Sequence, residues 1–359
     1  MNILYLLPNY NLYGGTPKKT LDLIKHSSNQ CYLYVWSEKY AKDFKQSFID
    51  NNATVYDNVG RNIIPHFRSI LGIIDKHNIQ ILQTQFFFGE LLAGLIKIFR
   101  PKVKVLGAFV GAKSPEGFKH KILKHLYGKF DAFVFISNYV KTERENVYPY
   151  LKTANTHVVY NGTQKLALNE NDINLKPNGE FLVLCVSGLT KIKNVQVLID
   201  TMCILQKKGY SSIKLLVAGD GPEKDNFMHQ IHKNRLEDQI ILLGYQKNVG
   251  SLLYQADVYA HPCYIEGFGI AVAEAMVAEK PIIVSNAGAL PELIKNEDTG
   301  LTVYPFNPEA WAKAIIRLKN DKKFAAKLAK KAKAVAEERF SVEQFVCNYN
   351  TLYKTLLEH

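Results

Sequence analysis

Short apolar runs alternate with longer amphipathic stretches from one end of the chain to the other. Two of the runs, Phe181–Val186 and Ala132–Ile136, are apolar at every position, which is typical of parallel strands covered by helices on both faces. The pattern predicts strands in the first half over Asn2–Leu7, Cys31–Trp36, Ala53–Tyr56, Ile79–Thr84, Val103–Phe109, Ala132–Ile136 and His157–Tyr160. In the second half it predicts strands over Phe181–Val186, Ile213–Ala218, Ile240–Leu243, Val258–His261 and Pro281–Val284.

The repeated alternation of strand and helix predicts an α/β fold made of two doubly wound, Rossmann-like domains. A chain of 359 residues fits two domains of roughly 150 to 200 residues each. We expect one domain over residues 1–164 and another over 165–340, with a polar linker near residues 169–179. The chain then becomes helical and rich in lysine. Its last expected helix lies within residues 341–359, and packing back on the first domain is one option for it.

The composition, 47% hydrophobic and 22% charged, is ordinary for a globular protein and argues against disorder or a fibrous repeat. No run of 18 apolar residues occurs, and the first residues lack the basic stretch and cleavage site of a signal peptide. Five scattered cysteines without a CxxC pair suit a reducing compartment, and we expect a cytoplasmic protein. They are Cys31, Cys185, Cys203, Cys263 and Cys347.

The most specific stretch of the sequence runs from His261 to Glu292. A predicted strand ends at His261, the loop Glu266-Gly267-Phe268-Gly269 follows, and a helix then carries Glu274. Glycines let a backbone approach a ligand closely, and the N–H groups at a helix start favour a phosphate. Two carboxylates eight residues apart can face one polar ligand across such a loop. Taken alone, each feature is also common in αβ turns and on solvated helix faces.

Together, these features resemble the E-x7-E signature of the family 4 retaining glycosyltransferases. The segment Gly288-Ala289-Leu290-Pro291-Glu292 resembles the glycine-rich turn that follows it in that family. The resemblance implies the GT-B fold, in which two Rossmann-like domains face each other across a cleft. It also implies that Glu266 faces the donor sugar and that Glu274 holds the nucleotide ribose. The other donor-binding residues implied in this loop are Gly267, Phe268, Gly269 and Ile270.

A second resemblance covers Val186–Ile199, where the family has a strand, then Gly-Arg-Leu, then a lysine that opens a helix. Lys193 stands at the lysine position. The resemblance therefore implies that the charge of Lys193 neutralises the leaving diphosphate, and that Lys193 and Glu266 are the catalytic residues. Gly188 stands where the family has the arginine, a departure that puts full activity in doubt. Lys191 lies in the same loop and can reach the same phosphates.

Weaker resemblances complete the implied donor site. Leu243-Gly244-Tyr245 resembles the loop that meets the nucleobase, which points to Tyr245. In the first half, Tyr13–Pro17 resembles the loop that closes over the donor phosphate, which points to Gly14 and Gly15. The histidine that many relatives carry after the strand Val103–Phe109 is absent. No D-x-D or other metal signature accompanies the motifs, so we expect neither a metal nor any cofactor besides the nucleotide-sugar co-substrate.

The positive charge is concentrated in the first half of the chain. Residues 1–164 carry 21 Lys and Arg against 11 Asp and Glu, whereas the remainder carries 24 against 22. We expect a helix over Glu116–Lys129 with Phe118, Ile122, Leu123 and Leu126 on its apolar side. Such a basic helix either contacts an anionic membrane from the cytoplasmic side or packs on the core with a solvated face. The basic residues between Lys97 and Lys129 are Lys97, Arg100, Lys102, Lys104, Lys113, Lys119, Lys121, Lys124 and Lys129.

The sequence therefore predicts a retaining hexosyltransferase that uses a nucleoside-diphosphate sugar, by default a UDP-sugar. The expected acceptor is a glycan or lipid-linked molecule in bacterial surface polysaccharide synthesis, and no nucleic acid is expected as a partner. Two alternatives stay open. A non-catalytic partner subunit of the same fold is favoured by Gly188 and the missing histidine, and a nucleotide-sugar epimerase would turn over the donor without an acceptor.

Overall fold

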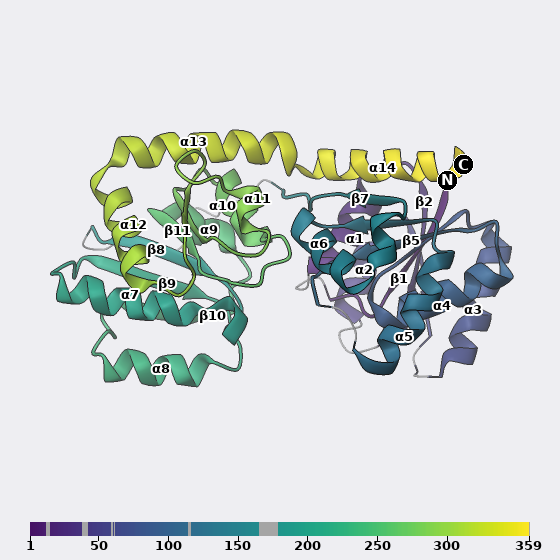
Figure 1. Ribbon diagram of the computed structural model, residues 1–359, viewed down its shortest axis with the longest axis horizontal. Helices are drawn as coiled ribbons and strands as arrows, with labels where there is room; N and C mark the ends of the chain where they lie inside the picture. The colour runs from purple at the N-terminus through teal and green to yellow at the C-terminus, as the bar shows by residue number, and fades with distance from the viewer. Residues whose placement is uncertain are drawn as a thin grey trace. The chain divides into compact units, whose positions relative to one another are not determined.

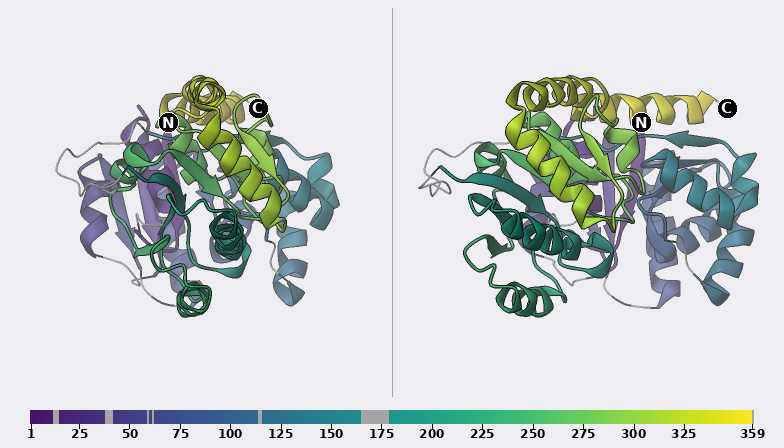
Figure 2. Two further views of the ribbon diagram at one scale, coloured as in Figure 1. Left: turned by 90° about the vertical axis from the view of Figure 1, so that its left-hand side faces the viewer. Right: turned by 60° about the vertical axis from the view of Figure 1, so that its left-hand side comes forward.

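The chain forms two α/β units, each built on a parallel β-sheet (Figures 1 and 2). A computed structural model describes residues 1–11, 15–37, 42–58, 60, 62–113, 116–164 and 179–358. The first unit comprises Met1–Gly162 together with Val342–His359, and the second comprises Thr163–Ser341. Most of the expected linker, residues 169–178, lies outside the described residues.

The sheet of the first unit has seven strands in the order β3-β2-β1-β4-β5-β6-β7. The order reverses between β1 and β4, and ligands of doubly wound sheets bind beyond the carboxyl ends of the strands at such a reversal. The strands are β1 Asn2–Leu7, β2 Gln30–Val35, β3 Ala53–Asp57, β4 Ile81–Thr84, β5 Lys104–Phe109, β6 Ala132–Phe135 and β7 Thr156–Val158.

Helices cover both faces of this sheet because side chains alternate along each strand. Ile3, Tyr5 and Leu7 of β1 pack in one core cluster with α1 and α14, whereas Leu4 and Leu6 pack in another with α3 and α4. The helices of this unit are α1 Gly15–Lys25, α2 Lys42–Ile49, α3 Ile63–His77, α4 Phe86–Phe99, α5 Gly117–Leu126, α6 Asn138–Val147 and α14 Val342–Glu358. Two 3-10 turns, η1 Tyr127–Lys129 and η2 Pro149–Lys152, complete it.

Helix α14 is the last element of the chain, yet it belongs to the first unit (Figure 1). Its buried side chains include Leu352 and Leu356. The hydroxyl of Tyr353 donates to Gln83 Oε1 of β4 at 2.5 Å and lies 3.3 Å from the hydroxyl of Tyr5 in β1. The helix is therefore fixed to the two central strands by a buried polar contact as well as by apolar packing.

The sheet of the second unit has six strands in the order β10-β9-β8-β11-β12-β13. They are β8 Phe181–Val186, β9 Ile213–Ala218, β10 Ile240–Gly244, β11 Val258–His261, β12 Ile282–Ser285 and β13 Leu301–Val303. The helical elements are η3 Lys191–Lys193, α7 Val195–Lys207, α8 Lys224–Lys233, α9 Val249–Gln255, α10 Ile270–Val277, α11 Leu290–Leu293, α12 Pro308–Asn320 and α13 Lys322–Arg339. Helices α7 and α12 lie side by side and pack with α8 on one face of the sheet (Figures 1 and 2).

The predicted fold class is confirmed: both sheets are parallel and covered by helices. Each of the twelve predicted strands is present, with ends within two residues of the expected ones. The sequence pattern did not reveal β13, because three residues of alternating burial are too short to stand out.

The expected apolar side of the helix over Glu116–Lys129 is partly wrong. The α-helix α5 begins at Gly117 and ends at Leu126, and a 3-10 turn follows it. Leu123 and Leu126 are buried, but Phe118 is 77% exposed. The contact with α4 explains the difference: a Cβ on Gly94 would lie 2.8 Å from Leu126 Cβ. The close approach at Gly94 therefore brings the end of α5 onto α4, whereas the first turn of α5 projects into solvent.

Among the helices of the described segments, none is both long and apolar enough to cross a bilayer.

Candidate functional site

The strongest cluster of charged side chains in the second unit lies beyond the carboxyl ends of β8 and β11. From β8 the chain passes through a loop into η3 and then into α7, and Asn194 makes the turn between them in the left-handed region, at φ 52°. Its buried side chain donates to Pro305 O at 2.7 Å and to Pro262 O at 3.4 Å. Asn194 thus joins the loops that follow β8, β11 and β13, and it fixes the position of the preceding Lys193.

Lys193 and Glu266 form an ion pair, with Lys193 Nζ 2.7 Å from Glu266 Oε2. The side chain of Lys193 is 26% exposed and that of Glu266 is 15% exposed, so water screens the pair only in part. Seventy-three positions of sequence separate the two residues. The structure therefore brings together the two residues that the sequence analysis expected to be catalytic.

A second partner of Glu266 comes from β11. His261 Nε2 lies 3.0 Å from the same Oε2 atom, and His261 Nδ1 lies 3.2 Å from the hydroxyl of Tyr259. That hydroxyl donates to Val186 O of β8 at 3.3 Å. A continuous chain of polar contacts thus runs from the backbone of β8 to the carboxylate, and it fixes the orientation of Glu266.

These contacts determine the charge of Glu266. Burial alone would raise the pKa of its carboxyl, but the hydrogen bond with His261 and the charges of His261 and Lys193 outweigh burial and hold that pKa well below its usual range. Burial alone would lower the pKa of Lys193, because it also disfavours the charged form of an amine. The charge of the neighbouring Glu266 carboxylate outweighs this effect, so that the pKa of Lys193 is raised. The site therefore presents a permanently ionised carboxylate that can only accept hydrogen bonds.

Glycines shape the loop that carries Glu266. Gly269, at φ 101°, precedes α10, and Gly288, at φ 58°, lies behind the loop. A Cβ on Gly288 would stand 2.7 Å from both the N and the O of Glu266. Ala289 N donates to Glu266 O at 2.9 Å. The turn after β12 is thus packed directly against the Glu266 backbone, which explains why a glycine is needed there.

Of the remaining residues expected in this loop, Phe268 is buried, whereas Gly267, Ile270 and Glu274 are partly exposed. Glu274 lies on α10, and its charge acts on Tyr259, as does that of Glu266. Both carboxylates therefore lie near the same tyrosine of β11.

The loop after β8 lies against the turn after β9. A Cβ on Gly219 would stand 2.0 Å from Ser187 O, and one on Gly221 would stand 2.4 Å from Leu189 O. A Cβ on Gly188, in contrast, would meet only Asp220 O at 3.8 Å. The position at which the resembling family carries an arginine therefore has room for a side chain.

Two further predicted donor residues of this unit are solvent-accessible. Lys191 is exposed in η3, and Tyr245 is 56% exposed directly after β10. In the first unit, Gly15 is the exposed first residue of α1, and Gly14 lies outside the described residues.

His261, Cys263 and Glu266 offer ligand atoms within 4.8 Å of one another, the spacing of a small metal site. The arrangement fits an ion pair better, because the ammonium of Lys193 stands at the Glu266 oxygen that would bind a metal. Burial raises the pKa of the Cys263 thiol to about 12, and its Sγ donates to Ile265 O. A protonated thiol is a poor metal ligand.

Three residues of the site were not predicted: Asn194, Tyr259 and His261. Asn194 and Tyr259 act through partners at least 68 positions away, and His261 acts through Tyr259 and Glu266 on either side of it. A histidine at the end of a strand, directly before the glycine-bearing loop, was the one available signal, and the sequence analysis used it only as a boundary.

Substitution of Gly288 tests the packing behind Glu266. We expect Gly288→Ala to lower the free energy of unfolding by roughly 1–3 kcal/mol, because the new methyl group would contact the Glu266 backbone and the φ angle is positive. Urea unfolding followed by circular dichroism measures the change. The matched control, Gly188→Ala, should stay within about 0.5 kcal/mol of the wild type. Equal effects of the two substitutions would contradict this account.

Comparison with known proteins was made on the sequence and on the structure. Residues 168–335 match the family described as Glycosyl transferases group 1. Over 178 residues the chain is 29% identical to the N-acetyl-alpha-D-glucosaminyl L-malate synthase of Bacillus anthracis, a match that covers 50% of this chain and 46% of that protein. Over 234 residues it is 27% identical to the O-antigen biosynthesis glycosyltransferase WclY of Escherichia coli, covering 63% and 62% of the two chains. The chain thus spans about half to three fifths of the length of these curated relatives.

The structure is similar to that of HepE of Anabaena, solved in complex with UDP, with a TM-score of 0.86 and 20% sequence identity. The match covers 99% of this chain and 100% of that one. At this identity the likeness shows the fold, the GT-B type with two doubly wound α/β units. Residues 168–335, which carry the Lys193–Glu266 pair and its surrounding loops, are thus the part of the chain that is similar to the group 1 glycosyl transferases.

Proposed function

We propose that the protein is a retaining glycosyltransferase that takes a sugar from a nucleoside-diphosphate sugar. The observation that supports it best is the ion pair of Lys193 and Glu266 beyond the carboxyl ends of the strands, beside the glycine loops of the second unit. The carboxylate is fixed by two partners and ionised, which suits it to accept hydrogen bonds from sugar hydroxyls. The ammonium of Lys193 can bind a diphosphate while it remains paired with Glu266.

Each residue has a role in this proposal. Tyr245 lies next to the base, Glu274 binds the ribose, and Lys193 and Lys191 neutralise the diphosphate. Glu266 binds the sugar. The bond between the anomeric carbon and the phosphate oxygen breaks as the acceptor oxygen attacks from the same face. The phosphate oxygen takes the acceptor's proton, so that no separate base and no metal is needed. Lys193 stabilises the charge that develops on the departing diphosphate.

UDP is the proposed nucleotide, because HepE, whose fold this chain shares, was solved with UDP and with UDP-glucose. A glycan or lipid-linked acceptor of a bacterial surface polysaccharide is proposed because WclY acts in O-antigen biosynthesis. A relative from Staphylococcus aureus acts in capsular polysaccharide biosynthesis. A non-catalytic partner subunit with Gly188 in place of arginine is the second candidate.

A nucleotide screen tests the donor proposal. Among UDP, GDP, ADP and their common sugar conjugates, we expect UDP compounds to stabilise the protein. A ligand at about 100 times its dissociation constant contributes about 2.7 kcal/mol. Thermal unfolding measures the shift, which Glu274→Ala and Lys193→Ala should abolish.

The control for this screen is Lys313→Ala on the exposed face of α12, which should keep the full shift. If no nucleotide stabilises the wild type, the proposed function is instead that of a non-catalytic partner subunit. Donor turnover without an acceptor, accompanied by inversion of a sugar hydroxyl, would instead identify an epimerase.

The empty space at Gly188 yields a gain-of-function test. Gly188→Arg should tighten UDP binding by about tenfold, because a charge-assisted hydrogen bond contributes about 1.5–3 kcal/mol. A Cβ at this exposed position would meet only Asp220 O, at 3.8 Å. Calorimetric titration with UDP measures the affinity, and Gly188→Ala, which adds no charge, should match the wild type. Weaker binding by the arginine variant would contradict the proposed place of the diphosphate.

We also propose a cytoplasmic protein that contacts the anionic inner face of the cell membrane through α5. In the first turn of α5, Phe118 is 77% exposed, and Lys119, Lys121 and Lys124 are exposed along the helix. This is the composition of an interfacial helix. The proposed contact includes fewer basic residues than the stretch Lys97–Lys129 that the sequence suggested. Lys97 and Lys104 share Asp131, and Arg100 pairs with Asp75, so most of the positive charge of these three residues is already compensated.

Sedimentation with anionic liposomes tests the membrane contact. The double substitution Lys121→Glu and Lys124→Glu should lower binding strongly, since each lysine contributes about 1 kcal/mol near an anionic surface. The same charge change at Lys76 and Lys152, which are exposed elsewhere in the first unit, should have a much smaller effect. No binding by the wild-type protein would reject the proposal.

A further inference from the structure

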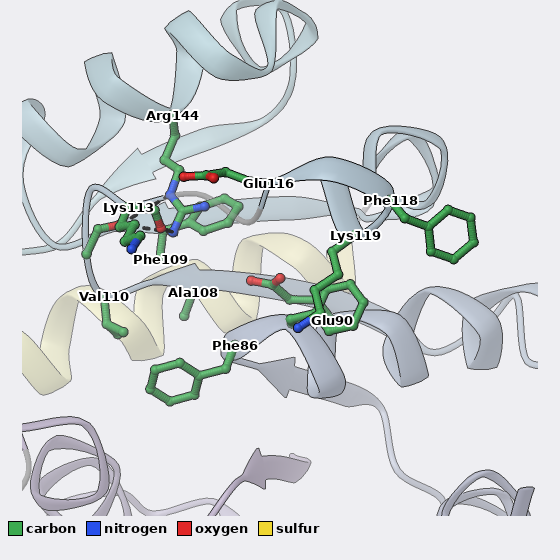
Figure 3. A pocket seen from close by; sticks show the side chains of 12 residues that line it. Phe86, Glu90, Ala108, Phe109, Val110, Lys113, Glu116, Phe118, Lys119 and Arg144 are labelled. Carbon is green, nitrogen blue, oxygen red and sulfur yellow. Dashed lines mark hydrogen bonds between the residues drawn. The ribbon is translucent and has the colours of Figure 1, made fainter. Parts of the chain in front are cut away.

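A pocket of about 890 Å³ lies beyond the carboxyl ends of β4 and β5 in the first unit (Figure 3). It is formed by the start of α4, the end of β5, the start of α5 and a side chain from α6. The pocket is therefore at the edge of the sheet where doubly wound folds bind ligands, one strand from the reversal of strand order. It belongs wholly to the first unit, whereas the Lys193–Glu266 pair belongs to the second.

Glu90 of α4 points into this pocket (Figure 3) although the residue is only 4% exposed. The hydroxyl of Tyr127 donates to its Oε2 atom at 3.1 Å, and in the described part of the chain this is the one hydrogen bond that the carboxyl receives. Burial raises the pKa of Glu90 to about 7, against the opposing effects of the Arg144 charge and the Tyr127 hydrogen bond. The other carboxyl oxygen of Glu90 faces the pocket, where a hydroxyl of a ligand can donate to it.

Aromatic rings form the walls of the pocket. Phe86, Phe87 and Phe109 line it, and Phe86 is 41% exposed. The backbone of Phe86 has φ 67°, in the left-handed region that bulky residues rarely adopt. Such strain costs about 1–3 kcal/mol and is found mostly where a side chain must be aimed at a ligand. The conformation of Phe86 is thus a second observation, independent of Glu90, that points to a ligand.

The cations around the pocket divide into two kinds. Arg144 is structural: it donates to Gly111 O at 3.0 Å and to Lys113 O at 2.7 Å, and it stacks on Phe109 at 4.6 Å. It therefore holds the loop after β5 in place. Lys113 and Lys119 line the pocket and are exposed, with Lys119 Nζ 5.2 Å from the centre of the Phe87 ring. The exposed Glu116 also lines the pocket, so the two ammonium groups leave the rim with an excess of one positive charge.

We propose that this pocket binds the acceptor and that the acceptor is a saccharide bearing an anionic group. A sugar ring packs its C–H face on Phe86, one hydroxyl donates to Glu90, and the anion lies between Lys113 and Lys119. A purely apolar ligand, such as a lipid chain, would displace water from the Glu90 carboxyl and leave it with the Tyr127 hydroxyl alone. The identification as an acceptor rests on the proposed glycosyl transfer. Glu90 then binds the sugar ring, and Lys113 and Lys119 determine the preference for an anionic acceptor.

Direct binding of monosaccharides, without donor, tests this proposal. The probes are glucose 6-phosphate and glucuronic acid, which carry the anion as phosphate or carboxylate, with glucose as the neutral reference. Saturation-transfer NMR on the whole protein should show both anionic sugars binding at least about tenfold more tightly than glucose, the worth of one charge-assisted contact. The tighter of the two identifies which anion the acceptor carries.

Matched variants assign the binding to the pocket. Glu90→Gln, which keeps the shape of the side chain, should weaken all three sugars about tenfold. Lys113→Met together with Lys119→Met should bring the anionic sugars to the level of glucose. Lys121→Met, on the same helix but outside the lining, should change nothing.

The outcomes separate this proposal from the donor site. Each variant should keep the thermal shift with UDP, which also shows that it is folded. If the wild type is stabilised by UDP yet binds none of the sugars, or if Glu90→Gln binds them as tightly as the wild type, the pocket proposal is overturned and the donor proposal stands. Sugar binding that persists without any response to UDP would overturn the proposed glycosyl transfer instead.

Discussion

The ion pair between Lys193 and Glu266 is the constraint on which the second unit's loops depend. Both charges are largely withdrawn from water, and leaving either one buried without its partner would cost about 3–5 kcal/mol. The loops must therefore hold the two residues together across 73 positions of sequence. Asn194 does so from one side, through the carbonyls of Pro262 and Pro305, and Gly288 does so from the other, by close packing behind Glu266.

Pairing also prepares the site for an anionic ligand. A carboxylate held by Lys193 and His261 does not need to reorganise when a hydroxyl-bearing ligand arrives. The ammonium of Lys193 is partly exposed, so it can accept a further anion without giving up its partner. The contacts that offset the cost of burying the two charges thus also hold the carboxylate and the ammonium in position for a ligand. The structural and the proposed catalytic roles of these residues therefore rest on the same contacts.

The sequence predicted correctly those features that a local pattern of residues determines by itself. Strands covered on both faces must be apolar throughout, and all of those predicted are present. Glu266 and Lys193 were identified by motif, and the structure places them in contact. The sidedness of α5 was misjudged because it depends on the close approach allowed by Gly94, a contact between helices that no local pattern encodes. The pocket around Glu90 was missed for a similar reason: the run from Phe86 to Phe88 looks like ordinary core, and its strained φ angle leaves no trace in composition.

The division of the first unit between the two ends of the chain has a consequence for its synthesis. Helix α14 covers the face of the sheet to which Tyr5 and Leu7 contribute, but it follows every residue of the second unit. On the ribosome, where chains fold from the N-terminus onward, the part of that face covered by α14 must stay exposed until the second unit has emerged, although α1 and α2 already cover the rest. The second unit is continuous in sequence and lacks this dependence. The half of the protein that is translated first is therefore the half that can be completed last, and the part of its sheet that α14 covers is the surface that a chaperone would need to shield.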